Sequence, residues 1–174
     1  MIEEIYFQRA QKNPSPAYRQ WVLDQADLTD LKPHVRGLIY TPHQHDDSLM
    51  YIHTSIRSRM GIRGVSHNIR VLPEAFGKPI NTAADLWCTI KYHEGFHAKE
   101  LYENPWDVVT PPWRTARFFM DVAVVEEVFR RRFEREIRAL RNVAENMGSA
   151  GVSDDYTKDV AEKIDACEYQ LSLI

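Results

Sequence analysis

The stretch 82-TAADLWCTIKYHEGFHAKELYEN-104 combines a helix-start signal, a helical apolar pattern and two histidines four residues apart. Thr82 and Asp85 have the spacing of a capping box, in which each side chain hydrogen-bonds to the backbone N–H of the other residue. Asn104 precedes Pro105, and a residue before proline is disfavoured in helical geometry. The sequence therefore predicts a helix over Ala83–Glu103.

This helix contains the pattern His-Glu-x-x-His. Residues i and i+4 of a helix lie on one face, so the imidazoles of His93 and His97 can reach a single cation. Glu94 lies beside them and can accept a proton from a water that the cation activates. We therefore predict that His93 and His97 bind Zn²⁺ and that Glu94 is the catalytic general base.

A catalytic zinc ion takes a third protein ligand and keeps one position open. Glu126 interrupts the apolar stripe of a long helix predicted from about Thr115 to Met147, and a buried glutamate needs a partner such as a metal or an arginine. We predict Glu126 as the third ligand and keep Glu127, on the polar face, as the second choice. Glu100 and Glu103 are nearer the motif, but the helix should carry both to its surface.

The segment His93–His97 (HEGFH), followed by a glutamate on a later helix, resembles the gluzincin zinc metallopeptidases, the thermolysin-like group, in a compact form similar to the minigluzincins. The resemblance covers Thr82 to Arg130. It implies a zincin-like fold, with a small antiparallel sheet over the active-site helix and a second helix that delivers the glutamate ligand.

The residues around Glu126 depart from the thermolysin-like pattern. There, an asparagine precedes the glutamate ligand and an aspartate four residues after it orients a ligand histidine; here Val125 and Arg130 occupy those positions. Another residue must then orient the histidines, and Asp107 and Asp121 are candidates.

The remaining segments predict an α+β fold. Runs of β-forming residues separated by turn residues predict about three antiparallel strands, at Gly37–Tyr40, Leu49–Ser55 and Ser66–Leu72. Two further helices are predicted, at Pro14–Ala26 and at Val152–Leu171. Gly148 is the expected end of the long helix. The sheet should pack on the motif helix, the long helix and the C-terminal helix.

Length and composition indicate one soluble domain over residues 1–174, and the resemblance implies that this domain is zincin-like. The chain is 44% hydrophobic and 27% charged, as in globular proteins, and its net charge of -3 gives no reason to expect nucleic acid or an anionic membrane as partner. The first residues lack an export signal and no apolar run is long enough to span a membrane, so we expect a cytoplasmic protein. Cys88 and Cys167 should then be reduced thiols.

Two other polar segments have structural explanations. The segment 41-TPHQHDDS-48 holds metal-binding side chains, but its composition is also typical of a polar turn, which we prefer. The arginine-rich run 130–141 includes glutamates and a continuing apolar stripe, which favours a solvated amphipathic helix over a nucleic-acid surface.

The predicted function is that of a zinc-dependent metallopeptidase acting on a peptide or protein substrate. The alternative is a non-catalytic, metal-stabilised zincin-like binding or regulatory module, which the short chain and the departures around Glu126 favour. A third reading is that HEGFH is ordinary helix surface and binds no metal.

Overall fold

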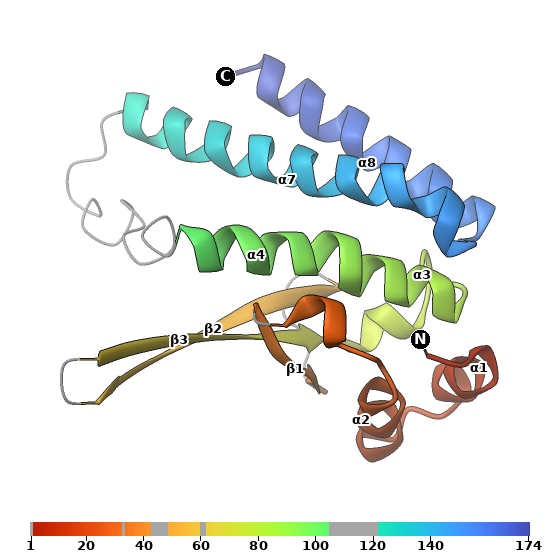
Figure 1. Cartoon of the computed structure of the whole chain (residues 1–174). Coiled ribbons are helices and arrows are strands. Elements are labelled where there is room, and N and C mark those ends of the chain that lie inside the picture. The colour runs from red at the N-terminus through yellow and green to blue at the C-terminus, as the bar shows by residue number, and fades with distance from the viewer. Residues whose placement is uncertain (1, 33, 43–48, 60–61, 105–121) are drawn as a thin grey trace.

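The computed structural model describes residues 2–32, 34–42, 49–59, 62–104 and 122–174. Within them the fold is α+β, as predicted, with a three-stranded sheet under two layers of helices (Figure 1). The strands are β1 (Val35–Tyr40), β2 (Met50–Arg59) and β3 (Ile62–Val71). The helical elements are α1 (Glu4–Lys12), α2 (Pro16–Asp24), η1 (Thr29–Leu31), η2 (Pro73–Phe76), α3 (Ala83–Cys88), η3 (Thr89–Glu94), α4 (Gly95–Glu103), α7 (Val122–Ala150) and α8 (Asp154–Ser172).

The sheet is mixed, which corrects the prediction of an antiparallel sheet. Its order is β1-β3-β2, with β2 antiparallel to β3 and β1 parallel to β3. The chain passes from β1 to the opposite edge of the sheet and returns through β2 and β3. The returning strand β3 therefore inserts between the first two and runs in the direction of β1. Strand propensity and turn composition do not specify this order.

The predicted motif helix is present as α3, η3 and α4 in succession. It starts with the predicted capping box, since the Thr82 side chain accepts a hydrogen bond from the Asp85 N–H and Asp85 accepts one from the Thr82 N–H. Its middle part, η3, is π-helical, which the sequence pattern did not predict. Such turns inside α-helices are frequent at functional sites, and this one contains His93 and Glu94.

Helix α7 packs on η3, and α8 packs on α7; Figure 1 shows α7 and α8 side by side. The expected stop at Gly148 is wrong, because α7 continues to Ala150 and the left-handed residue is Gly151, with φ of 67°. The predicted start of α7 near Thr115 lies outside the described residues. Ser153 accepts a hydrogen bond from the Tyr156 N–H and caps α8.

The N-terminal part contributes α1, which was not predicted, and α2, which was. The helix α1 is mainly polar, and only Phe7 and Ala10 are buried in it, so its apolar pattern is weak. The core lies where helices meet the sheet, and Ile69 and Val71 of β3 belong to the same buried cluster as Leu86 and Ile90 of the motif helix. None of the helices within the described ranges is both long and apolar enough to cross a bilayer.

Asp85 joins the start of the motif helix to the start of α8. It is fully buried, and its carboxylate accepts hydrogen bonds from the N–H groups of Asn81, Thr82 and Ser153 and from the Ser153 hydroxyl, at 2.8 to 2.9 Å. One side chain thus satisfies backbone donors at two helix starts, which fixes the motif helix relative to α8.

We expect Asp85→Ala to lower the free energy of unfolding by about 3–5 kcal/mol, because it leaves three partly buried N–H groups and one hydroxyl without their acceptor. Urea denaturation of the purified variant measures this loss. Asp155→Ala is the matched control, since Asp155 lies at the same junction but is exposed and, among the described residues, accepts only from the Asn81 side chain at 3.1 Å. A loss for Asp85→Ala no larger than that of the control would contradict the role given to Asp85.

Candidate metal centre

The π-helical segment η3 is held against α7 by a side chain. The Asn142 amide donates a hydrogen bond to the backbone carbonyl of Tyr92, 2.7 Å away. Asn142 belongs to the same helix as Glu136, and Tyr92 directly precedes His93. This bond therefore sets the position of α7 along the motif helix at the level of the histidines.

Gly95, the residue after the motif glutamate, allows the helix to approach η1 closely. A Cβ atom at this position would lie 2.6 Å from Leu31 Cδ2 and 3.3 Å from the Ile90 carbonyl oxygen. Both separations are too short for a comfortable contact. Because Gly95 has no side chain, the motif helix can pack closely against η1, the segment that precedes β1.

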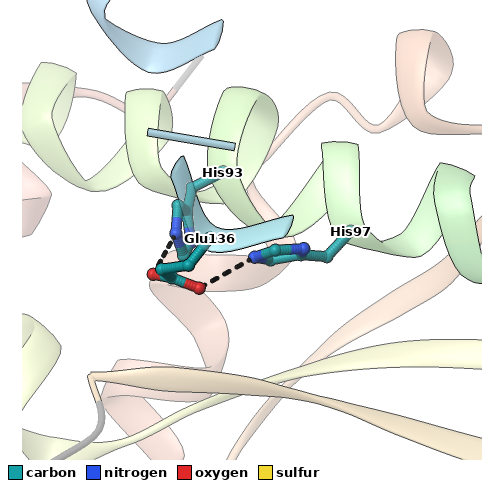
Figure 2. A group of neighbouring side chains, drawn as sticks. All are labelled: His93, His97 and Glu136. Carbon is teal, nitrogen blue, oxygen red and sulfur yellow. Dashed lines mark hydrogen bonds and ion pairs between the residues drawn. The ribbon is translucent and has the colours of Figure 1, made fainter. Parts of the chain in front are cut away.

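His93, His97 and Glu136 form the centre of the site (Figure 2). His93 Nε2 lies 2.9 Å from Glu136 Oε1, and His97 Nε2 lies 3.3 Å from Glu136 Oε2. The two imidazole planes are nearly perpendicular, at 84°, and both point at the carboxylate. The motif helix supplies the histidines and α7 supplies the glutamate, so the site exists only where these two helices meet.

The histidines are nearly enclosed and the glutamate less so. The exposed fractions of the side chains are 16% for His93, 14% for His97 and 39% for Glu136. Burial lowers the pKa of His93, but hydrogen bonds to Glu136 and Glu94 outweigh it and raise the pKa to about 10. Burial likewise raises the pKa of Glu136, yet the two histidines outweigh it and hold the pKa well below its ordinary value.

His93 contacts a carboxylate through each ring nitrogen. Besides the Nε2 contact, its Nδ1 lies 3.1 Å from Glu94 Oε1. A carboxylate can only accept hydrogen bonds, so both imidazole nitrogens donate and His93 carries a positive charge. Without a metal, the proton on His93 Nε2 thus supplies positive charge beside Glu136.

The residues fit a divalent cation. The ligand atoms of His93, His97 and Glu136 all lie within 4.8 Å of one another, so the three side chains form a group that could hold a metal ion. A tetrahedral zinc ion with bonds of about 2.1 Å keeps its ligand atoms roughly 3.4 Å apart. The distance from His97 Nε2 to Glu136 Oε2, 3.3 Å, is close to this value, and the distance from His93 Nε2 to Glu136 Oε1, 2.9 Å, is shorter. His97 Nδ1 is also buried with no hydrogen-bond partner among the described residues, so only its Nε2 is committed to the group.

Glu94 is placed next to this group but is not part of it. Its side chain is 8% exposed, and its Oε1 accepts from His93 Nδ1. A carboxylate on the second nitrogen of a ligand histidine fixes the tautomer and the ring orientation. The orienting role sought in Asp107 or Asp121, both outside the described residues, can therefore be met by Glu94.

A cavity of about 460 Å³ opens beside the three residues. Its wall includes His93, His97, Glu94 and Glu136, and further residues of α7 and α8, Tyr156 among them, also line it. Thr89 and Tyr156 close one side through a hydrogen bond of 2.8 Å between their hydroxyl groups. The centre therefore faces a space large enough for a small ligand.

Glu126, predicted as the third ligand, lies elsewhere. It is exposed, and it precedes Glu136 by ten residues on α7, which corresponds to roughly 15 Å along the helix. Glu127, the second choice, is also exposed and pairs with Arg131 at 2.6 Å. The predicted helix thus does deliver a glutamate to both histidines, but the residue is Glu136, and neither Glu126 nor Glu127 belongs to the group.

The sequence does contain a signal for Glu136. Phe129, Phe133, Glu136, Leu140 and Val143 are spaced four and three residues apart, so Glu136 interrupts an apolar stripe just as Glu126 interrupts a neighbouring one. Burial separates the two stripes, because from Glu126 onward, where burial in α7 is described, the first buried residue is Ile137. Residues 126–136 are exposed or partly buried, which the local sequence pattern does not predict.

The other candidates do not join the site. Glu100 binds Arg138 at 2.9 Å and links α4 to α7, and Glu103 is exposed. The histidines and aspartates of the segment 41–48 fall at positions 43, 45, 46 and 47, outside the described residues. The arginine-rich run lies on α7 with most of its arginines exposed, in agreement with a solvated helix face.

Comparisons with known proteins assign no family to this chain. No family model matches the chain, and neither the curated proteins nor the solved structures give a match.

Proposed function

We propose that this protein is a zinc-dependent hydrolase of peptide or other amide bonds, with His93, His97 and Glu136 as the metal ligands and Glu94 as the general base. The convergence of two imidazoles from His-Glu-x-x-His and one carboxylate on a single point beside a cavity carries this proposal. Two nitrogen donors and one oxygen donor are a ligand set of catalytic zinc, which leaves one position free for substrate or water.

On binding a metal, these ligands would give up one proton. His93 would lose the Nε2 proton that it donates to Glu136 and would keep the Nδ1 proton that it donates to Glu94. The partly exposed carboxylate of Glu136 would neutralise part of the cation's charge. A zinc ion in this place would acidify water and polarise the carbonyl of an amide.

Glu94 has the chemistry required of the base. It lines the cavity and is adjacent to His93, so it is within the space that substrate and water share. It takes one proton from the attacking water, whose oxygen forms a bond to the carbonyl carbon. The carbon–nitrogen bond then breaks, and the amine leaves with the proton that Glu94 carried. The products are one acid and one amine.

Metal content provides the first test. We expect the purified, untagged protein to retain about one zinc ion per chain by elemental mass spectrometry, and a His93→Ala/His97→Ala variant to retain none. Zinc supplied at a hundredfold excess over its dissociation constant should stabilise the wild type by about 2.7 kcal/mol and leave the double variant unchanged. A wild type that takes up no zinc would overturn the metal centre.

One observation favours a second function, that of a non-catalytic, metal-stabilised binding module. Glu94 is mostly buried and its Oε1 is committed to His93, as expected of a residue that only orients a ligand. Under this alternative zinc raises the melting temperature, yet a broad set of peptides survives incubation with the zinc-loaded protein. Hydrolysis that depends on zinc would exclude it.

A further inference from the structure

The cavity beside the metal centre has a cationic part that the proposed chemistry does not use. Arg132 of α7 and Lys163 of α8 both line it, together with His93, His97 and Glu136. Arg132 precedes Glu136 by one helical turn, roughly 6 Å along the axis. The two cations therefore border the same space as the metal ligands.

Arg132 is available for a ligand. It is exposed and forms no ion pair within the part of the chain that the structure describes. Lys163 contacts Asp159 at 2.8 Å, and its side chain remains 47% exposed. Burial and the charge of Glu136 raise the pKa of the Cys167 thiol, and the charges of Arg132 and Lys163 lower it. The charges of Glu136, Arg132 and Lys163 are therefore all close enough to affect Cys167, which lines the same cavity.

The charge of the cavity depends on the metal. Among the described residues of its wall, Glu94, Glu136 and Asp159 are acidic, and Arg132 and Lys163 are basic. Without metal, the positive charge of His93 brings the balance of these charges to neutral, and a divalent cation in place of the His93 proton would make it positive. The loaded site therefore attracts an anion, and Arg132 offers the planar pair of donors that matches a carboxylate.

Much of the remaining wall of the cavity is apolar. Phe133, Leu140, Val143 and Val160 are among its lining residues. A ligand that contacts both the cations and the apolar residues of the cavity has an apolar body and one carboxylate. One or two extended residues, at roughly 3.3–3.6 Å each, span the helical turn between Glu136 and Arg132.

We propose that the substrate carries a carboxylate within one or two residues of the scissile amide, and that Arg132, assisted by Lys163, binds it. This inference rests on the proposed zinc-dependent function and gives it a substrate class. The carboxylate is either the C-terminus of a short peptide or an acidic side chain, because both present the same group.

Two matched zinc-binding probes test the carboxylate site. One is a benzyl-substituted hydroxamic acid with a free carboxylate, and the other is the same compound as the carboxamide. Calorimetry on the zinc-loaded protein should show about tenfold tighter binding of the carboxylate, as expected for one charge-assisted contact at a partly exposed site. The double variant Arg132→Gln/Lys163→Gln should bring the ratio close to one and leave binding of the carboxamide unchanged.

Arg131→Gln is the control, since it removes the same charge one position away, where the side chain pairs with Glu127 at 2.6 Å and does not line the cavity. It should leave the ratio at its wild-type value. Equal binding of both probes to the wild type, or a ratio that survives the double variant, would overturn the inference while leaving the metal centre intact. Failure of the protein to bind zinc would instead remove the proposed function itself.

Peptide hydrolysis then separates the two sources of the carboxylate. Cleavage of free acids but not of C-terminal amides assigns it to the C-terminus. Cleavage of peptides with glutamate but not glutamine near the scissile bond, whatever the C-terminus, assigns it to a side chain. Equal cleavage of all four classes contradicts the inference.

Discussion

Replacing Glu136 with alanine should weaken zinc binding by more than about a hundredfold, whereas the same change at Glu126 should leave it unaltered. Loss of a residue that only orients a ligand typically costs 10- to 100-fold in metal affinity, and loss of a direct ligand should cost more. Glu136 lies 2.9 and 3.3 Å from the two histidines, and Glu126 is exposed roughly 15 Å along the helix. Competition with a chromophoric zinc chelator measures both affinities.

These two variants form a matched pair because they remove the same side chain from the same helix. Each interrupts an apolar stripe in the sequence, so local pattern alone treats them alike. Circular dichroism should show that both variants keep their helical content. Loss of zinc on Glu126→Ala with retention on Glu136→Ala would place the third ligand at Glu126 and would contradict the packing of α7 described above.

Replacing Glu94 with glutamine should reduce kcat for hydrolysis by about 10²- to 10⁴-fold while leaving one zinc ion bound. Glutamine has the shape of glutamate and its carbonyl can still accept from His93 Nδ1, but it cannot take a proton from water. The measurement uses a fluorogenic peptide that the wild type cleaves, together with metal analysis of the same sample. Glu103→Gln is the control, since Glu103 lies on the same motif helix and is exposed.

The outcome at Glu94 also separates the two proposed functions. Unchanged hydrolysis would remove the general-base role. A fall in zinc affinity without a separate effect on turnover would show that Glu94 acts by holding His93, through the contact of 3.1 Å to its Nδ1. That result would favour the metal-stabilised module, in which the glutamate of the motif is structural.

The sequence predicted the features that depend on neighbours along the chain. The capping box of Thr82 and Asp85 forms as its spacing requires, and Ser153 caps the final helix. His93 and His97 share a helix face because four residues make about one turn. These interactions lie within one or two turns of helix, so a short stretch of sequence contains all the groups involved.

The tertiary structure decided which distant groups meet. Glu126 and Glu136 both interrupt apolar stripes, and only the packing of α7 on η3, with Asn142 bound to the Tyr92 carbonyl, brings Glu136 to the histidines. The mixed sheet arises in the same way, since the return of β3 between β1 and β2 is a pairing of distant segments. Helical periodicity predicts which residues share one face of a helix. It does not predict at which of these residues another helix makes contact. The sequence alone therefore determined the motif and the kind of residue that completes it, and helix packing selected Glu136, because that choice depends on contacts between segments about forty residues apart.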